Sequence, residues 1–423
     1  MSADALKTTP PSRGSLLVIF LTVFIDLLGF GMVLPLLPIY AKTFGVDKHG
    51  WQIGVLMASF SAMTFLFSPL WGRLSDRIGR RPVLLIGLAG SALFYFLFGL
   101  ATVWKSLAWL FITRIGAGIA AATLPTAQAY IADATTTKTR AKGMALIGAA
   151  FGLGFTFGPL LGFAAIWLSR EEDVATSPWP GFVAAGLSAL SFLLALLVLP
   201  ESLRPGQASK ASEAHRLLDL RSWRDAFSTP SVPALLFTAF FGVVSFGAFE
   251  TTLSLLLESK AFQFKLSDVL LYFAFIGLTL SLAQGFLVRR LSTRVSESKL
   301  VFAGCLVTIA GLVLLALATQ RGELWMLMVA SAVEVTGFAL MNPSLQALIS
   351  RRSDPAKQGG ILGVSQSTSA LARVCGPLLA IPLFYVGPAY PYWAAIGMMA
   401  LALVLFVLLA RVGVDYGHPP DSE

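Results

Sequence analysis

The sequence predicts an all-α polytopic membrane protein, with twelve transmembrane helices in two pseudo-symmetric six-helix bundles. Three observations indicate this fold class. The 423 residues are 56% hydrophobic and only 13% charged, and the mean hydropathy of +0.77 lies far outside the range of soluble domains. The apolar residues form runs long enough to cross a bilayer as helices, which takes about 20 residues. A long polar connection divides these runs into two equal sets.

Each apolar run is expected to be one helix, because lipid leaves every backbone amide to be satisfied within its own segment. The polar segment 1–14 is not followed by a small-residue cleavage site, so we expect the first run to remain as a span. The twelve runs lie near 15–41, 51–72, 83–103, 105–133, 141–168, 181–200, 231–257, 267–288, 299–319, 323–350, 358–386 and 390–411.

Lysine and arginine indicate the orientation of the spans. Alternate connections, counted from the N-terminus, hold 22 of these residues, whereas the other connections hold 7. Basic residues favour the cytoplasmic side, so we expect both termini to lie on the cytoplasmic side of a membrane, which we expect to be a bacterial inner membrane. The net charge of +9 then reflects topology and lipid contact, and does not indicate nucleic-acid binding. The expected organisation is a tail (1–14), an N-terminal half (15–200), a linker (201–230), a C-terminal half (231–411) and a tail (412–423).

The two halves also resemble each other, which indicates an internal repeat. Two short segments agree at one offset of 218 residues, which is hard to reach by chance. Parallel six-helix repeats are a known plan of secondary transporters, with the substrate site near mid-membrane at the repeat interface. The matching segments are LPTAQAYIAD (124–133) with NPSLQALISR (342–351), and GPLLG (158–162) with GPLLA (376–380).

Charge is concentrated in GRLSDRIGRRP, residues 72–82, between the second and third runs. Gly72 removes a side chain where the end of one helix could lie against another, and Gly79 suits a tight turn. Asp76 can lie against the positive end of a neighbouring helix. We expect three arginines to hold this connection at the inner face: Arg77, Arg80 and Arg81.

In this arrangement, G-x-x-x-D-R-x-G-R-R-P at 72–82 resembles the loop 2–3 signature of the major facilitator superfamily. Further motifs resemble its twelve-helix drug:proton antiporter branch, near the tetracycline-resistance efflux proteins. These motifs are DLLGFGMVLPLLPIY (26–40), RIGAGIAAA (114–122), AYIAD (129–133) and GLGFTFGPLLG (152–162).

The resemblance implies roles for individual residues. Asp76 and Arg80 would form an inner-face charge cluster with Asp133 that latches the outward-facing state. Arg114, in span four, would be tied to proton coupling. The antiporter motif, on the side of helices two and five, would consist of Gly154, Gly158, Pro159 and Gly162, where the lack of side chains allows close helix contact in lipid.

The chain departs from the tetracycline exporters in two places. Those exporters carry an acid in span three and a histidine in span eight, whereas LLIGLAGSALFYFLFGLA and LSDVLLYFAFIGLTLSLAQG have neither in mid-span. The three histidines, at 49, 215 and 418, fall in connections or the tail. The departure argues against metal-bound tetracycline as the substrate.

Charges inside spans are costly, about 3 kcal/mol each, so a mid-membrane ionisable group is treated as functional. We rank the proton-coupling candidates as Asp26, Glu334 and Glu250, and expect Arg114 to tune the pKa of the coupling acid. The competing interpretation is that these charges form structural ion pairs. Candidates for the cavity wall are Gln128, Phe246, Asn342, Gln346 and Arg373.

The predicted function is secondary active transport, as proton-coupled multidrug efflux of small amphipathic compounds by a monomer. A metabolite facilitator or proton symporter of the same fold is one alternative, and a transport-inactive membrane sensor is another. GAGIAA (116–121) resembles a dinucleotide loop but lies within a span and follows no strand. The sequence therefore indicates no enzyme, cofactor or metal site, and its expected partners are a small-molecule substrate, protons and the bilayer.

Overall fold

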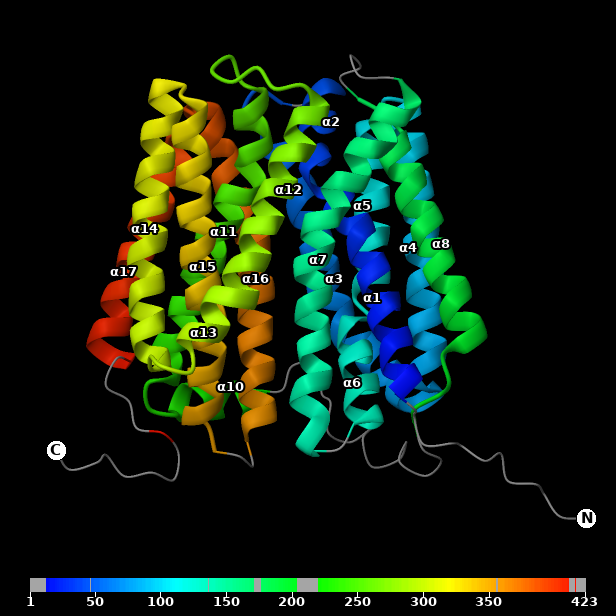
Figure 1. The fold of residues 1–423 in the computed structure, drawn as a ribbon, viewed down its shortest axis with the longest axis vertical. Helices are drawn as coiled ribbons and strands as arrows, with labels where there is room; N and C mark the ends of the chain where they lie inside the picture. The colour runs from blue at the N-terminus through cyan, green and yellow to red at the C-terminus, as the bar shows by residue number, and fades with distance from the viewer. Residues whose placement is uncertain are drawn as a thin grey trace, which may run out of the picture. The chain divides into compact units, whose positions relative to one another are not determined.

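A computed structural model describes residues 13–45, 47–135, 137–170, 176–203, 220–354, 357–410 and 415. The predicted all-α fold with twelve spans is confirmed, because twelve of its helices are long and apolar enough to cross a membrane (Figure 1). The described residues contain no strand. Most helix ends agree with the predicted span ends to within a few residues, but α3 extends beyond the predicted end at 72 to Ile78, and α4 begins at Arg80, before the predicted start at 83.

Each span consists of one helix or of two or three consecutive ones. The first span combines α1 (Arg13–Val33), a 3-10 turn (Leu34–Leu36) and α2 (Leu37–Thr43). The remaining helices of the first half are α3 (Trp51–Ile78), α4 (Arg80–Val103), α5 (Leu107–Ala121), α6 (Leu124–Ala134), α7 (Thr137–Ser169) and α8 (Trp179–Val198).

The second half begins with a short helix, α10 (Leu220–Ser228), which precedes the seventh span. Its spans are α11 (Val232–Glu258); α12 (Leu266–Leu282) continued by the π-helix η2 (Ala283–Val288) and α13 (Arg289–Leu291); α14 (Glu297–Arg321); α15 (Leu324–Arg352); α16 (Gln358–Val386); and α17 (Tyr390–Leu405) continued by the π-helix η3 (Phe406–Ala410).

The chain forms two compact units. Unit 1 comprises the described residues of 1–34, 63–168 and 177–217. In it α8 packs between α1 and α4, and α5 packs on the other side of α4. A core of Ile19, Leu88, Tyr130 and Ala195 brings α1, α4, α6 and α8 together. These side chains are buried between helices and do not face lipid, so helix packing fixes their positions.

Unit 2 comprises the described residues of 35–62, 169–176 and 218–423. Its closest neighbours are α14 with α15, and α11 with α16 and α17. Figure 1 shows α14, α15 and α16 side by side, with α10 and α13 at one end of the unit.

The division into units cuts the first two spans. Residues 35–62 belong to unit 2, because α2 and the start of α3 pack against α11 and α16. Lys42 Nζ lies 2.8 Å from Glu258 Oε2. A Cβ on Gly54 would stand 3.1 Å from the carbonyl oxygen of Pro377, so glycine makes this close approach of α3 to α16 possible without a shift of either helix.

The start of α3 is held by Asp47. Its carboxylate accepts hydrogen bonds from the backbone N–H groups of His49, Trp51 and Gln52, while the Gln52 side chain accepts one from Asp47 N. This reciprocal arrangement satisfies amides that have no partner inside the helix. The bonds, above all the one from Gln52, hold the pKa of Asp47 below its usual value.

Candidate functional site

The charged segment 72–82 is almost entirely helical, which corrects the expected loop. Helix α3 continues to Ile78 and α4 begins at Arg80, so the connection is the single residue Gly79. Its φ of +108° lies in the left-handed region that side chains avoid. Gly79, which was expected to suit a tight turn, forms the turn by itself and brings the ends of α3 and α4 together.

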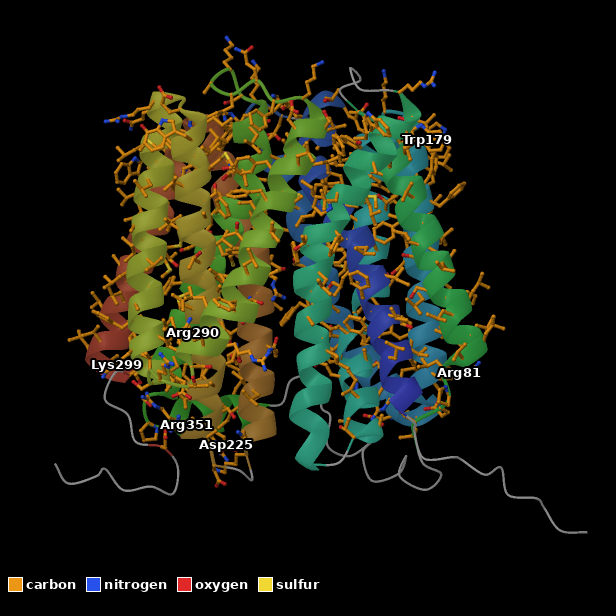
Figure 2. The ribbon with its side chains drawn as sticks, viewed as in Figure 1. Arg81, Trp179, Asp225, Arg290, Lys299 and Arg351 are labelled. Carbon is orange, nitrogen blue, oxygen red and sulfur yellow. The ribbon has the colours of Figure 1, made fainter. Side chains whose placement is uncertain are left out.

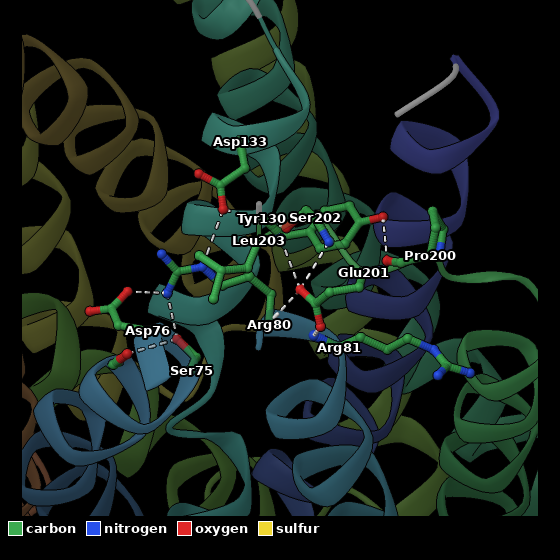
Figure 3. Close-up of polar contacts among 11 residues, drawn as sticks. Ser75, Asp76, Arg80, Arg81, Tyr130, Asp133, Pro200, Glu201, Ser202 and Leu203 are labelled. Atoms are coloured by element: carbon green, nitrogen blue, oxygen red, sulfur yellow. Dashed lines mark hydrogen bonds and ion pairs between the residues drawn. The ribbon is translucent and has the colours of Figure 1, made fainter. Parts of the chain in front are cut away.

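Arg80 lies at the centre of a polar cluster in unit 1 (Figure 3). Its guanidinium contacts Asp76 Oδ1 at 2.5 Å, Ser75 Oγ at 2.6 Å and Asp133 Oδ2 at 3.2 Å. Only 8% of the residue is exposed. A buried guanidinium is tolerated because carboxylates on two different helices, α3 and α6, satisfy it. The three residues implied by the loop signature thus lie together.

Glu201 is a member of this cluster that the sequence analysis missed. Its Oε1 accepts hydrogen bonds from the backbone N–H groups of Arg80, Ser202 and Leu203, each at 2.9 Å, and its Oε2 accepts one from Arg81 N at 3.1 Å. The carboxylate at the start of α4 is therefore Glu201, although Asp76 was expected to lie at a helix end of this kind.

A sequence signal for Glu201 does exist. The acid follows directly on the sixth span in LPES, but it was placed in the linker 201–230. Tyr130 donates to the carbonyl oxygen of Pro200 at 3.1 Å, and Ser202 Oγ donates to Asp133 Oδ2 at 3.4 Å. These bonds tie the end of α8 to α6, so the segment after the sixth span closes the cluster.

The other residues of the predicted latch differ in their surroundings. Arg81 Nη2 donates to the carbonyl oxygen of Leu196 at 2.6 Å, near the end of α8. Arg77 is exposed. No described atom lies within 4 Å of the position that a Cβ would take on Gly72, so the expected close helix contact is not found there.

Two glycines of the antiporter motif of α7 pack against α1. A Cβ on Gly158 would stand 2.7 Å from the Leu28 carbonyl oxygen, and one on Gly31 would stand 2.6 Å from the Gly154 carbonyl oxygen. Pro159 and Gly162 of the same motif are buried. The two backbones are therefore in direct contact.

The same crossing occurs in unit 2. There α11 meets α16, and a Cβ on Gly376 would stand 3.3 Å from Cα of Gly247. Gly376 is the residue that the 218-residue offset pairs with Gly158. The internal repeat is therefore visible in packing, as two helix pairs that cross at glycines.

Asp26 of α1 is partly buried against α4 and α8. It accepts a hydrogen bond from Ser188 Oγ at 3.5 Å and another from Ser91. Arg114 of α5 is 2% exposed, with its guanidinium carbon 6.0 Å from the centre of the Phe30 ring. Tyr95 interacts electrostatically with both Asp26 and Arg114. The two charges expected to pair thus share a tyrosine neighbour.

The remaining ionisable candidates gather in unit 2. Glu334 of α15 is fully buried, and neither carboxylate oxygen has a hydrogen-bond partner in the described part of the chain. It packs against α14 where Gly311 has no side chain. Glu250 of α11 interacts electrostatically with both Glu334 and Arg373 of α16. Three helices therefore bring two acids and one arginine together.

The candidates for the cavity wall are distributed over both units. In unit 1, Gln128 is exposed on α6. In unit 2, Gln346 accepts a hydrogen bond from Ser365 Oγ at 3.2 Å, and Asn342 is partly buried one turn earlier on α15. Phe246 stacks on a second ring, Phe338, with the ring centres 4.1 Å apart.

Comparison with known proteins gives this arrangement a family. The sequence model of the Major Facilitator Superfamily matches residues 19–319 and 285–422. The chain is 34% identical to the tetracycline resistance protein, class E, of Escherichia coli, over 84% of each chain. It is 28% identical to multidrug resistance protein 2 of Bacillus subtilis (strain 168), over 94% of this chain and 96% of that one.

A solved structure agrees with these matches. The human organic anion transporter MFSD10 (TETRAN) superposes with a TM-score of 0.67 and 28% identity, over 94% of this chain and all of that chain. The predicted resemblance is confirmed: this chain, a multi-pass membrane transporter and not an enzyme, belongs to the major facilitator superfamily.

Proposed function

We propose that this protein exports small amphipathic organic molecules in exchange for protons, by alternating access between the halves 15–200 and 231–411. The observation that carries the proposal is Glu334, a fully buried carboxyl group without a hydrogen-bond partner among the described residues. The resistance proteins among its relatives support the direction of transport.

A carboxyl group in this position suits proton coupling for a physical reason. An ionised carboxylate without partners is very costly in apolar surroundings, so the group needs either a proton or a compensating charge. Glu250, a second acid, interacts with Glu334, and Arg373 interacts with Glu250. A group that holds a proton in one conformation and releases it in another biases the equilibrium between the two.

Asp26 remains our first candidate for the coupling group, followed by Glu334 and then Glu250. Two serine hydroxyls, from α4 and α8, hydrogen-bond to Asp26, and Arg114 is held nearby with Tyr95. These hydrogen bonds favour an ionised Asp26, whereas no described residue donates a hydrogen bond to Glu334. The two acids would thus differ in which protonation state the resting conformation stabilises.

Transport into everted vesicles tests this proposal. Uptake of a labelled drug panel is measured with and without an imposed proton gradient. Asp26→Asn should abolish gradient-driven uptake while substrate binding persists, and Glu334→Gln should reduce that uptake at least tenfold. Glu323→Gln is the matched control, because Glu323 is an exposed acid directly before α15, the helix that carries Glu334. Undiminished gradient-driven uptake by Asp26→Asn would reject Asp26 as the coupling group.

We also propose that Asp76, Arg80 and Asp133 act as a conformational latch. Asp76→Asn removes the ion pair at 2.5 Å, so Arg80 loses one of the carboxylates that keep it in place. Transport should fall while the amount of protein in the membrane stays constant. A variant that transports at the wild-type rate would contradict the latch.

Organic anions are a second candidate substrate class. The human relative MFSD10 is described as an organic anion transporter, and Arg373 of α16 is exposed, as a residue that meets an anionic ligand would be. The stacked Phe246 and Phe338 instead favour apolar cations or neutral drugs. Competition between a lipophilic cation and an organic anion for uptake decides between the two classes, and Arg373→Gln should weaken only the anion.

The location and assembly are part of the same proposal. We expect a monomer in the bacterial inner membrane with both termini in the cytoplasm, because the basic connections alternate with poorly charged ones. An epitope added at the C-terminus should become accessible to antibody only after the cells are permeabilised.

A further inference from the structure

The eighth span ends in an unusual backbone. After α12, the π-helix η2 (Ala283–Val288) widens the last turns before α13, and such helices occur frequently at functional sites. A surface hollow of about 500 Å³, open to the outside and called the cavity below, lies against this segment and is lined by Gly285, Phe286, Arg289 and Arg290. A Cβ on Gly285 would meet no described atom within 4 Å, so this residue leaves the cavity open.

The two arginines of the cavity carry charge that nothing nearby neutralises. Both are exposed, and neither side chain has an ion pair or hydrogen bond with any residue that the structure describes. The acid that follows them, Glu297, is 2.8 Å from Arg351 and so is already paired. Figure 2 shows Arg290, Lys299 and Arg351 at the same end of unit 2.

The charged segment of unit 1 shows what is missing here. Gly72 is followed four residues later by Asp76, and Gly285 is followed four residues later by Arg289. In unit 1 the acid at this position neutralises an arginine within the protein. In unit 2 the equivalent position adds a second positive charge, so no acid among the described residues neutralises this end of the span.

Apolar side chains border the cavity on the same segment. Phe286 is 68% exposed and Leu282, one turn earlier, is 60% exposed. Both belong to the span Leu266–Leu291, so these side chains suit the acyl region of a bilayer. The arginines follow at the end of the span, where a helix reaches the headgroup layer.

We propose that this cavity binds an anionic phospholipid, with Arg289 and Arg290 at the headgroup phosphate and Phe286 against the upper acyl chain. The guanidinium group suits phosphate because its donors form a planar fork. A free anion would use the arginines alone, whereas the order of apolar and then basic residues along one helix end matches a lipid in the membrane. The inference does not depend on the transported substrate.

Native mass spectrometry of the full chain in a neutral detergent tests the site. The protein is titrated with phosphatidylglycerol, with phosphatidylcholine and with inorganic phosphate. The double variant Arg289→Gln/Arg290→Gln should lose about thirtyfold in affinity for phosphatidylglycerol, with phosphatidylcholine binding unchanged. Arg289→Lys/Arg290→Lys keeps the charge and should stay within about threefold of the wild type.

The control is the double variant Lys260→Gln/Arg321→Gln, which removes two exposed basic residues of the same unit. Arg321 is the last residue of α14, and Lys260 lies before the first residue of α12. Both are therefore at the ends of these helices that are remote from the cavity. The control should bind phosphatidylglycerol as the wild type does. Equal loss in both Gln variants would reduce the effect to net charge and overturn the proposal. Competition by inorganic phosphate at equal concentration would do the same, because it would identify a free-anion site.

Discussion

Removing the Glu201 carboxylate gives a direct test of the polar cluster in unit 1. The first amides of a helix have no partner within it, and those of Arg80 and Arg81 donate to Glu201 at 2.9 and 3.1 Å. Because α4 begins at Arg80, these two bonds determine whether its first turn stays closed. Glu201→Ala should therefore open that turn without disturbing the middle of the span.

The size of the effect follows from known helix caps. Loss of a capping side chain costs about 1 kcal/mol, and loss of a negative charge at a helix N-terminus costs about 0.3–1 kcal/mol. Glu201 is exposed, so the lower end of the second value applies. A total of about 1.3 kcal/mol corresponds to about ninefold faster amide exchange.

Hydrogen exchange resolved to residues 80–81 is the assay. Glu201→Gln keeps a neutral acceptor and should give a smaller effect than Glu201→Ala. Glu258→Ala is the control, because Glu258 forms an ion pair with Lys42 and lies in unit 2. Unchanged exchange at Arg80 and Arg81 in Glu201→Ala would refute the reasoning, because it would show that the Glu201 carboxylate does not protect these two amides.

Three further outcomes are expected. The lowered pKa of Asp47 means that its carboxylate stabilises the fold above the unfolded pKa of about 3.9, and that this stability is lost as the pH falls through the lower folded value; the difference in Tm between wild type and Asp47→Asn should therefore shrink below about pH 4. Glu334→Gln should leave Tm unchanged or higher, because an acid with no hydrogen-bond partner among the described residues gives way to a neutral group of the same size, and a large fall in Tm would show that Glu334 has a structural role. The pair of Lys42 and Glu258, with side chains 46% and 27% exposed, should show a coupling of less than about 1 kcal/mol in a double-mutant cycle, and that coupling should vanish in high salt.

The spans could be predicted from the sequence because hydropathy alone identifies them. Their charged ends could not, since the run 51–72 was ended at the first charges although the helix continues to Ile78. Arginine is a good helix former, so a helix extends past the hydrocarbon until a residue such as Gly79 stops it. The first charged residues of a span therefore mark the edge of the hydrocarbon layer, whereas the helix itself continues beyond that edge.

The candidate site was predicted in part, and the limit was again physical. Arg80, Asp76 and Asp133 follow from a local motif and its resemblance to a family. The hydrogen-bond donors of Asp26, Ser91 and Ser188, lie on two other helices, and a single sequence does not show which helices meet. Packing of the whole unit decides such contacts, so ranking the acids needs the fold.

The glycine crossings restrict which mutations the protein can accept. At Gly31 and Gly158 even a methyl group would overlap backbone atoms of the facing helix, so the smallest side chain available is already too large. Every single-nucleotide change of a glycine codon that alters the residue adds atoms at this contact. Random mutagenesis under selection for transport should leave glycine at these positions, while the lipid-facing positions of the same helices vary freely among apolar residues.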